Sequence, residues 1–161
     1  MKNPVGILTA FRIRDVMRGD VVTVRSKDTM GHAASVLQSY GISGAPVVND
    51  DGVCVGVISA SDFVSREVAS ANPPNVTSFA FDSMYVKKTI NVPPQIEANL
   101  VEDYMSTEVL TIGVNDPMME AARTLCEERV HRLVVTDKQN RPVGVISSLD
   151  IVACLVVAVE E

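Results

Sequence analysis

Two stretches of the chain share one pattern, VGVISASD at residues 55–62 and VGVISSLD at residues 143–150. Each begins with alternating β-branched residues, which is typical of a buried strand. Each ends in Ser-x-x-Asp, the spacing of a helix start in which a serine side chain and a carboxylate satisfy the first backbone N–H groups. The pattern therefore predicts, at both places, a strand that leads directly into a helix.

The shared pattern belongs to a longer internal repeat. Residues 15–64 align with residues 103–152 at a constant offset of 88, without a gap, and 17 of the 50 aligned positions are identical. Such self-similarity indicates two copies of one supersecondary unit, which usually cannot bury its apolar face alone. We assign a first repeat to residues 14–70, an insert to residues 71–99 and a second repeat to residues 100–159.

Each copy is expected to form strand, helix, strand, strand and helix. In the first copy these elements are a strand at 21–24, a helix capped by Asp28 and ended by Gly41, strands at 45–48 and 53–58, and a helix from near Ser61. In the second copy each element lies 88 residues later, so Asp116 is the expected cap and Pro117 the first helical residue.

Composition limits the classes of function. The 161 residues carry 14 basic and 20 acidic side chains, a net charge of −6, and the 28 valines predict an aliphatic core. Proteins that bind nucleic acid by neutralising phosphates carry excess basic charge, so we expect no nucleic-acid partner. The longest apolar run, 151–159, falls short of the roughly 20 residues that span a membrane, and no secretion signal is evident. We therefore expect a cytoplasmic protein without a membrane anchor.

No sequence feature indicates catalysis. The chain has no P-loop, nucleophile elbow, dinucleotide-binding glycine motif or metal-ligand spacing, so we expect no enzyme activity, no catalytic residue and no metal. Cys54, Cys126 and Cys154 form no C-x-x-C pair and are expected to be small buried hydrophobes in a reducing compartment.

The insert is bracketed by Pro73-Pro74 and Pro93-Pro94 and contains Phe79, Phe81 and Tyr85, three of the seven aromatic residues. An ordinary solvated linker is poor in aromatic residues. We expect the insert to pack, either on its own chain or on a partner.

The residues alone leave two interpretations of Ser-x-x-Asp open. In one, Asp62 and Asp150 only cap the helices that follow them. In the other, a carboxylate at the end of a strand accepts the hydroxyls of a ribose, beside a helix N-terminus that offers N–H groups to an anion.

The repeat, with its strand, Gly-Val-Ile-Ser, two further residues and Asp, resembles the CBS domain, named for cystathionine β-synthase, and the pair resembles a Bateman module. The resemblance implies an α/β (α+β) fold in which two β-α-β-β-α repeats pack pseudo-symmetrically into one disc-shaped module. It also implies two clefts between the repeats for adenosyl ligands. Asp62 and Asp150 would then hold ribose hydroxyls. Their neighbours would be the hydroxyl partners Ser59 and Ser147, and Thr23 and Thr111 at the ligand edge.

The two copies differ where a phosphate would be recognised. His131 and Arg132 resemble the basic stretch that contacts the AMP phosphate in the γ subunit of AMP-activated protein kinase, and a guanidinium matches phosphate geometry. A solvated strand entry is the alternative interpretation of this pair. The first copy has no charge at the aligned positions, which are held by Ser43, Gly44, Ala45 and Pro46. In the family, phosphate ligands often come from the repeat that faces the ribose Asp, so the resemblance implies tighter binding of a phosphorylated ligand at Asp62.

We therefore expect a stand-alone, non-catalytic regulatory module whose ligand is an adenine nucleotide, AMP, ADP or ATP. It would signal to a regulated protein through a change of conformation or of dimerisation. A sensor of S-adenosylmethionine or NAD, and a ligand-free interaction scaffold, are the alternatives. A homodimer is expected in either case, because helices of such repeats commonly mediate dimers and the apolar run at 151–159 must be buried.

Overall fold

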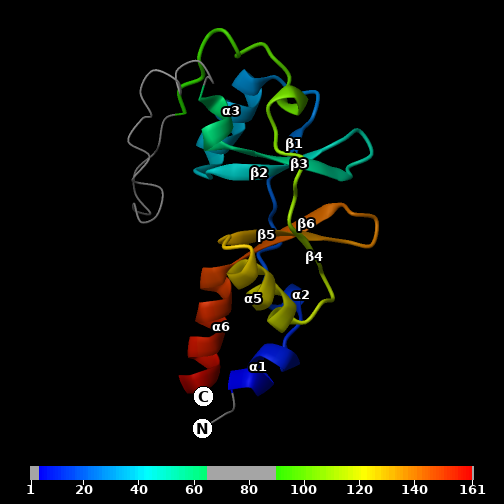
Figure 1. The fold of residues 1–161 in the computed structure, drawn as a ribbon, viewed down its shortest axis with the longest axis vertical. Coiled ribbons are helices and arrows are strands. Elements are labelled where there is room, and N and C mark those ends of the chain that lie inside the picture. The colour runs from blue at the N-terminus through cyan, green and yellow to red at the C-terminus, as the bar shows by residue number, and fades with distance from the viewer. Residues whose placement is uncertain (1–3, 65–89, 161) are drawn as a thin grey trace. The chain divides into compact units, whose positions relative to one another are not determined.

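The computed structural model describes residues 4–64 and 90–160 (Figure 1). Within these ranges the chain forms two compact units, and neither is one continuous stretch of sequence. The first-repeat unit, as we name it, takes residues 23–50 and most of 55–108. The second-repeat unit takes the residues before 23, residues 51–54 and the residues from 109 onward. Each unit contains one three-stranded sheet and its own hydrophobic core.

The sheet of the first-repeat unit has the order β1-β2-β3, and β1 runs parallel to β2 with Val24 opposite Val47. Its elements are β1 (Val24–Arg25), α3 (Met30–Tyr40), β2 (Gly44–Val48), β3 (Cys54–Ser59) and the short 3₁₀ helices η1 (Ala60–Phe63) and η2 (Val101–Asp103). Gly41 ends α3 in the left-handed conformation, with φ of 63°, as the sequence predicts.

The sheet of the second-repeat unit repeats this order as β4-β5-β6, with β4 parallel and β6 antiparallel to β5. Its elements are α1 (Pro4–Ala10), α2 (Ile13–Val16), β4 (Thr111–Gly113), α5 (Met118–Glu127), β5 (Arg132–Thr136), β6 (Pro142–Ser147) and α6 (Ser148–Glu160). The N-terminal helices α1 and α2 pack against α5 and α6 (Figure 1).

Each unit is completed by a segment that precedes the other repeat's strands in sequence. We call residues 12–18 and 100–106 the leading segments. Ile13 is 0% exposed in the core of the second-repeat unit, and Val101, the residue 88 positions later, is 0% exposed in the core of the first-repeat unit. Their backbone N–H groups donate equivalent hydrogen bonds of 2.9 Å, to the carbonyl oxygens of Asp116 and Asp28. Neither repeat, taken as a continuous stretch, supplies its whole core.

The glycine of the shared pattern is explained by the leading segments. Arg18 and Val145 exchange two backbone hydrogen bonds of 3.0 Å, directly beside Gly144. A Cβ atom on Gly144 would lie 2.6 Å from the carbonyl oxygen of Arg18, closer than a real Cβ contact allows. Gly56 has the same relation to the other leading segment, since its Cβ would lie 2.8 Å from the carbonyl oxygen of Ser106. Glycine therefore permits the backbones to meet.

The helix caps lie one residue later than predicted. Thr29 caps α3, with its Oγ1 accepting the N–H of His32 at 3.1 Å, and Pro117 occupies the cap position of α5 without a side-chain bond. The predicted caps, Asp28 and Asp116, instead accept backbone N–H groups three residues earlier, at 3.0 and 2.8 Å. Their carboxylates thus close the turn before each helix.

Two further expectations need correction. The first strand of each repeat begins late: residues 21–23 precede β1, where the N–H of Val21 bonds to the nearby carbonyl of Gly19 instead of to a sheet partner. Cys126 is exposed because it follows the buried Leu125 on α5 and faces away from the core, whereas Cys54 is buried and Cys154 is half-buried.

The three aromatic residues of the insert, Phe79, Phe81 and Tyr85, lie outside the described residues. The end of the insert is described, and Ile96 is buried in the core of the first-repeat unit. Across residues 4–64 and 90–160, none of the helices has the length and apolar character required to span a bilayer.

Candidate ligand-binding site

The second-repeat unit gathers its predicted site residues at one end of its sheet. Arg132 begins β5 directly opposite Ser147 at the end of β6, and Thr111 begins the parallel strand β4 at the same end. The carbonyl oxygen of His131 accepts the N–H of Ser148 at 3.1 Å, which attaches it to the turn that leads to Asp150. The side chains of Thr111, His131 and Arg132 are exposed.

The first-repeat unit places the aligned residues in the same way. The carbonyl oxygen of Ser43 accepts the N–H of Ala60 at 2.9 Å, beside the turn from Ser59 to Asp62. Thr23, immediately before β1, and Ser43 are both exposed. The structure therefore brings these residues together, but it buries Ala45 and Pro46 inside β2.

The capping geometry is present in both turns. Asp62 Oδ2 accepts the backbone N–H of Ser59 at 2.7 Å and its hydroxyl at 3.1 Å. Asp150 Oδ2 accepts the N–H of Ser147 at 2.8 Å and its hydroxyl at 2.7 Å. In each carboxylate one oxygen is committed to the turn. A ribose hydroxyl would have to use the other oxygen, Oδ1, or share Oδ2.

The two carboxylates differ at Oδ1, a difference that sequence reasoning missed. Arg18 Nε donates to Asp150 Oδ1 at 3.2 Å, with the arginine side chain 78% and the aspartate side chain 12% exposed. Among the described residues, none donates a hydrogen bond to Asp62 Oδ1 or forms an ion pair with it. The position aligned with Arg18 is Ser106, so the repeat gives no sign of this ion pair.

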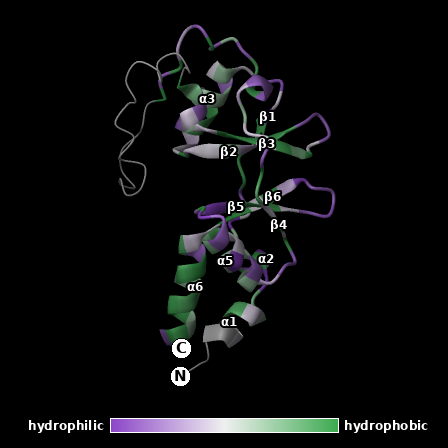
Figure 2. Ribbon diagram, viewed as in Figure 1, coloured by the Kyte–Doolittle hydropathy of each residue, from purple (hydrophilic) through white to green (hydrophobic). Residues whose placement is uncertain are grey.

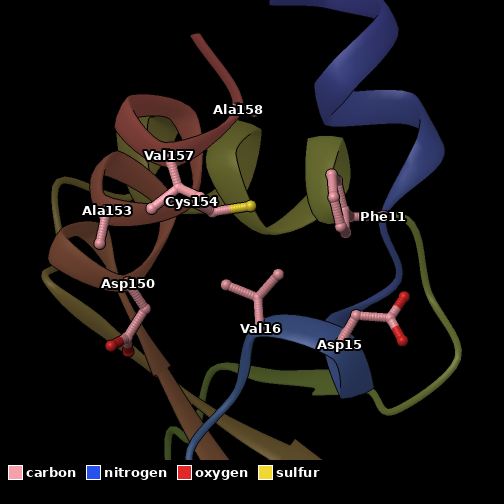
Figure 3. A pocket seen from close by; sticks show the side chains of 8 residues that line it. All are labelled: Phe11, Asp15, Val16, Asp150, Ala153, Cys154, Val157 and Ala158. Atoms are coloured by element: carbon pink, nitrogen blue, oxygen red, sulfur yellow. The ribbon is translucent and has the colours of Figure 1, made fainter. Parts of the chain in front are cut away.

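An apolar groove of about 450 Å³ lies within the second-repeat unit, between α6 and the N-terminal segment (Figure 3). Its lining consists of Phe11, Asp15, Val16, Asp150, Ala153, Cys154, Val157 and Ala158. Phe11, Val16 and the sulfur of Cys154 point into the same space, whereas the Asp15 carboxylate points away (Figure 3). Asp150 is the one predicted site residue in its lining, so this groove does not gather the candidate site.

The resolved pKa shifts lie away from the sheet ends that carry the site. The N–H of Arg141 donates to the Asp137 carboxylate at 2.9 Å and lowers the pKa of Asp137. A hydrogen bond of 2.8 Å to Glu102, in the second leading segment, raises the pKa of Lys27. Among the described residues, no three His, Cys, Asp or Glu side chains are grouped so that they could hold a metal ion.

Both repeats match a known protein family. The CBS domain family model matches residues 13–69 and 101–157. The chain is 28% identical over 144 residues to homoserine O-acetyltransferase of Methanococcoides burtonii, covering 89% of this chain and 24% of that protein. It thus spans about a quarter of that relative's length.

Two solved structures with bound adenosyl compounds share the fold. CBSX2 in complex with AMP is 19% identical, with a TM-score of 0.66 over 94% of this chain and 99% of that chain. The CBS domain pair of protein MJ0100, in complex with 5′-methylthioadenosine and S-adenosyl-L-methionine, is 20% identical, with a TM-score of 0.63. It covers 94% of this chain and 98% of that chain.

Proposed function

Because this chain belongs to the CBS domain family, we propose that it is a non-catalytic regulatory module that binds an adenine nucleotide, AMP, ADP or ATP. Three features at one end of each sheet support this proposal. They are a partly buried carboxylate in the Ser-x-x-Asp turn, a threonine, and the start of the central strand. The adenosyl group common to AMP, 5′-methylthioadenosine and S-adenosyl-L-methionine in the two similar structures supports the ligand class.

Different residues can recognise the ribose and the phosphate of such a ligand. Asp62 and Asp150 each offer carboxylate lone pairs to ribose hydroxyls, a donor and acceptor match that proteins use for the ribose of dinucleotides. Arg132 is exposed and offers several N–H donors to a phosphate. The first copy has no cation at the aligned position, Gly44. Arg132 therefore favours a phosphorylated ligand over S-adenosylmethionine or the nucleoside alone.

Calorimetric titration with AMP, ADP, ATP, NAD and S-adenosylmethionine tests the proposal. Asp62→Asn and Asp150→Asn keep the size of the capping side chain but remove the charge. Loss of a charge-assisted hydrogen bond costs about 1.5–3 kcal/mol, so each change should weaken its site roughly 10- to 150-fold. Asp50→Asn, in the exposed turn between β2 and β3 and so at the opposite end of β3 from Ser59, is the matched control. If none of the five compounds binds the unchanged protein at millimolar concentration, the proposal is wrong.

The phosphate role of Arg132 has a separate test. Arg132→Gln should weaken AMP binding roughly tenfold and leave adenosine binding almost unchanged, because only AMP carries a phosphate. Lys138, an exposed cation in the β5–β6 turn, provides the control variant Lys138→Gln. Equal losses for AMP and adenosine would show that Arg132 does not read the phosphate.

A second candidate function, a homodimeric interaction module, is favoured by the surface of α6. Its side chains Leu149, Val152, Val156, Val157 and Val159 are each at least 50% exposed. The helix is hydrophobic along most of its length (Figure 2). The run from Ile151 to Val159 contains no charge, so this face offers no electrostatic match to a charged partner. A second copy offers the identical uncharged face about a two-fold axis.

Light scattering at tens of micromolar tests the dimer. The unchanged protein should have twice the monomer mass, and Val152→Glu with Val156→Glu should give a monomer, since burying two carboxylates is unfavourable. Glu120→Gln, on the exposed surface of α5, is the control. A monomeric unchanged protein would contradict the proposal.

A further inference from the structure

The two ribose-binding candidates are unequal because one carboxylate already holds an internal cation. We propose that Arg18 acts as a specificity-determining residue that weakens ribose binding at Asp150, so that this chain fills the site of Asp62 first. The inference rests on the proposed function, since it assumes that both aspartates accept ribose hydroxyls.

Both oxygens of Asp150 are occupied within the second-repeat unit. Oδ2 holds the N–H and hydroxyl of Ser147, at 2.8 and 2.7 Å. Oδ1 accepts Arg18 Nε at 3.2 Å. The two hydroxyls of a ribose require two acceptor positions on one carboxylate, so a ribose at Asp150 must displace the guanidinium or share Oδ1 with it.

Within residues 4–64 and 90–160, the first-repeat unit shows the same turn without a cation paired to its carboxylate. Asp62 Oδ2 accepts the N–H and hydroxyl of Ser59, and none of the described residues donates a hydrogen bond to Oδ1. Ser106 stands where the other unit has Arg18, and both backbones pair with their strands in the same way, through two hydrogen bonds of 2.9 Å to Val57 or of 3.0 Å to Val145. At this position of the leading segment, the two units therefore differ in the side chain and not in the backbone pairing.

The size of the effect follows from the exposure of the ion pair. Asp150 is mostly buried, but Arg18 is 78% exposed, and exposed pairs of this kind correspond to roughly a two- to fivefold change in an equilibrium constant. Arg18 therefore makes the affinity for a ribose lower at Asp150 than at Asp62, but it abolishes binding at neither site.

Adenosine is the appropriate probe, because it carries the ribose but no phosphate that could itself attract Arg18. In an Asp62→Asn background, which isolates the Asp150 site, Arg18→Ser should tighten adenosine binding roughly two- to fivefold. In an Asp150→Asn background, the converse change Ser106→Arg should weaken the Asp62 site by a similar factor. Both substituted side chains are exposed, so both variants are expected to fold.

The salt dependence of adenosine binding distinguishes an electrostatic role of Arg18 from a purely structural one. Raising the salt from about 0.05 M to about 0.5 M screens an exposed ion pair. Higher salt should tighten adenosine binding in the Asp62→Asn variant, but not in the double variant that also carries Arg18→Ser. If adenosine binds and Arg18→Ser leaves its affinity unchanged or weaker, the inference is wrong and the proposed function stands. If neither adenosine nor AMP binds any variant or the unchanged protein, the proposed function fails and the inference falls with it.

Discussion

The close approach at Gly144 leads to a stability prediction that can be worked from distances. In Gly144→Ala the new methyl group would lie 2.6 Å from the carbonyl oxygen of Arg18 and 2.8 Å from the Met17 sulfur. The methionine can move, but the carbonyl belongs to a backbone that exchanges two hydrogen bonds of 3.0 Å with Val145. Relief of the clash therefore requires the leading segment to shift.

The expected loss is about 2–6 kcal/mol of unfolding free energy. Two neutral hydrogen bonds contribute roughly 0.5–1.5 kcal/mol each, and forcing a methyl group into a filled space costs roughly 1–3 kcal/mol. For a chain of this length each kcal/mol lowers the midpoint temperature by roughly 2–4 °C, so Gly144→Ala should melt about 4–24 °C lower. Gly56→Ala should behave alike, since its methyl group would lie 2.8 Å from the carbonyl oxygen of Ser106.

Urea unfolding followed by circular dichroism measures the loss. Gly19→Ala is the matched control, because nothing lies within 4 Å of a Cβ at that position. Removing a glycine from the unfolded chain is itself slightly stabilising, by about 0.4–1 kcal/mol, where the native backbone tolerates alanine. If Gly144→Ala unfolds within about 0.5 kcal/mol of Gly19→Ala, the assigned role of the shared glycine is wrong.

Three further predictions follow from the described contacts. Ile13→Ala should lower the unfolding free energy by about 2–5 kcal/mol, because Ile13 is fully buried in a core it reaches from outside the repeat; a loss below about 1 kcal/mol in urea unfolding would contradict this. Gly41→Ala should cost roughly 1–2 kcal/mol by the same assay, since φ of 63° is unfavourable for alanine. The pKa of Asp137 is lowered by the N–H of Arg141, so its stabilising effect is present above the ordinary aspartate pKa and lost as pH falls through the lowered value. Asp137→Asn should therefore be less stable than the unchanged protein at pH 7 and equally stable in strong acid; an unaltered difference at low pH would disprove the assignment.

Local signals predict the local elements well. The central and returning strands of both repeats lie within one residue of their expected positions, because runs of β-branched residues bounded by turn residues leave few alternatives. Gly41 ends its helix for a local reason as well, the left-handed backbone. The caps were misplaced by one residue because Asp28 and Thr29 both have side chains able to accept an N–H, and only geometry decides which one caps the helix.

Long-range partners were not predictable from the repeat. An alignment shows that Ile13 and Val101 are equivalent, but not that each packs with strands from the other copy. For the candidate site, the Ser-x-x-Asp turns follow from the pattern, whereas Thr23 and Thr111 are indicated only by the resemblance to the CBS domain. The ion pair between Arg18 and Asp150 joins residues 132 positions apart and has no counterpart in the first copy, so no periodicity or motif marks it.

The exchange of leading segments bears on how such a chain can arise. A single ancestral repeat with its own leading segment would have an open core and a leading segment with nowhere to pack. Two separate copies could each complete the other's hydrophobic core by exchanging these segments. The ancestor would then exist only as a dimer with exchanged segments. Gene duplication then converts an encounter between two molecules into a tethered reaction at high effective concentration. In this view the insert joins what were two molecules, and cutting the chain within residues 71–89, before the buried Ile96, should yield two fragments that recover native stability only when mixed.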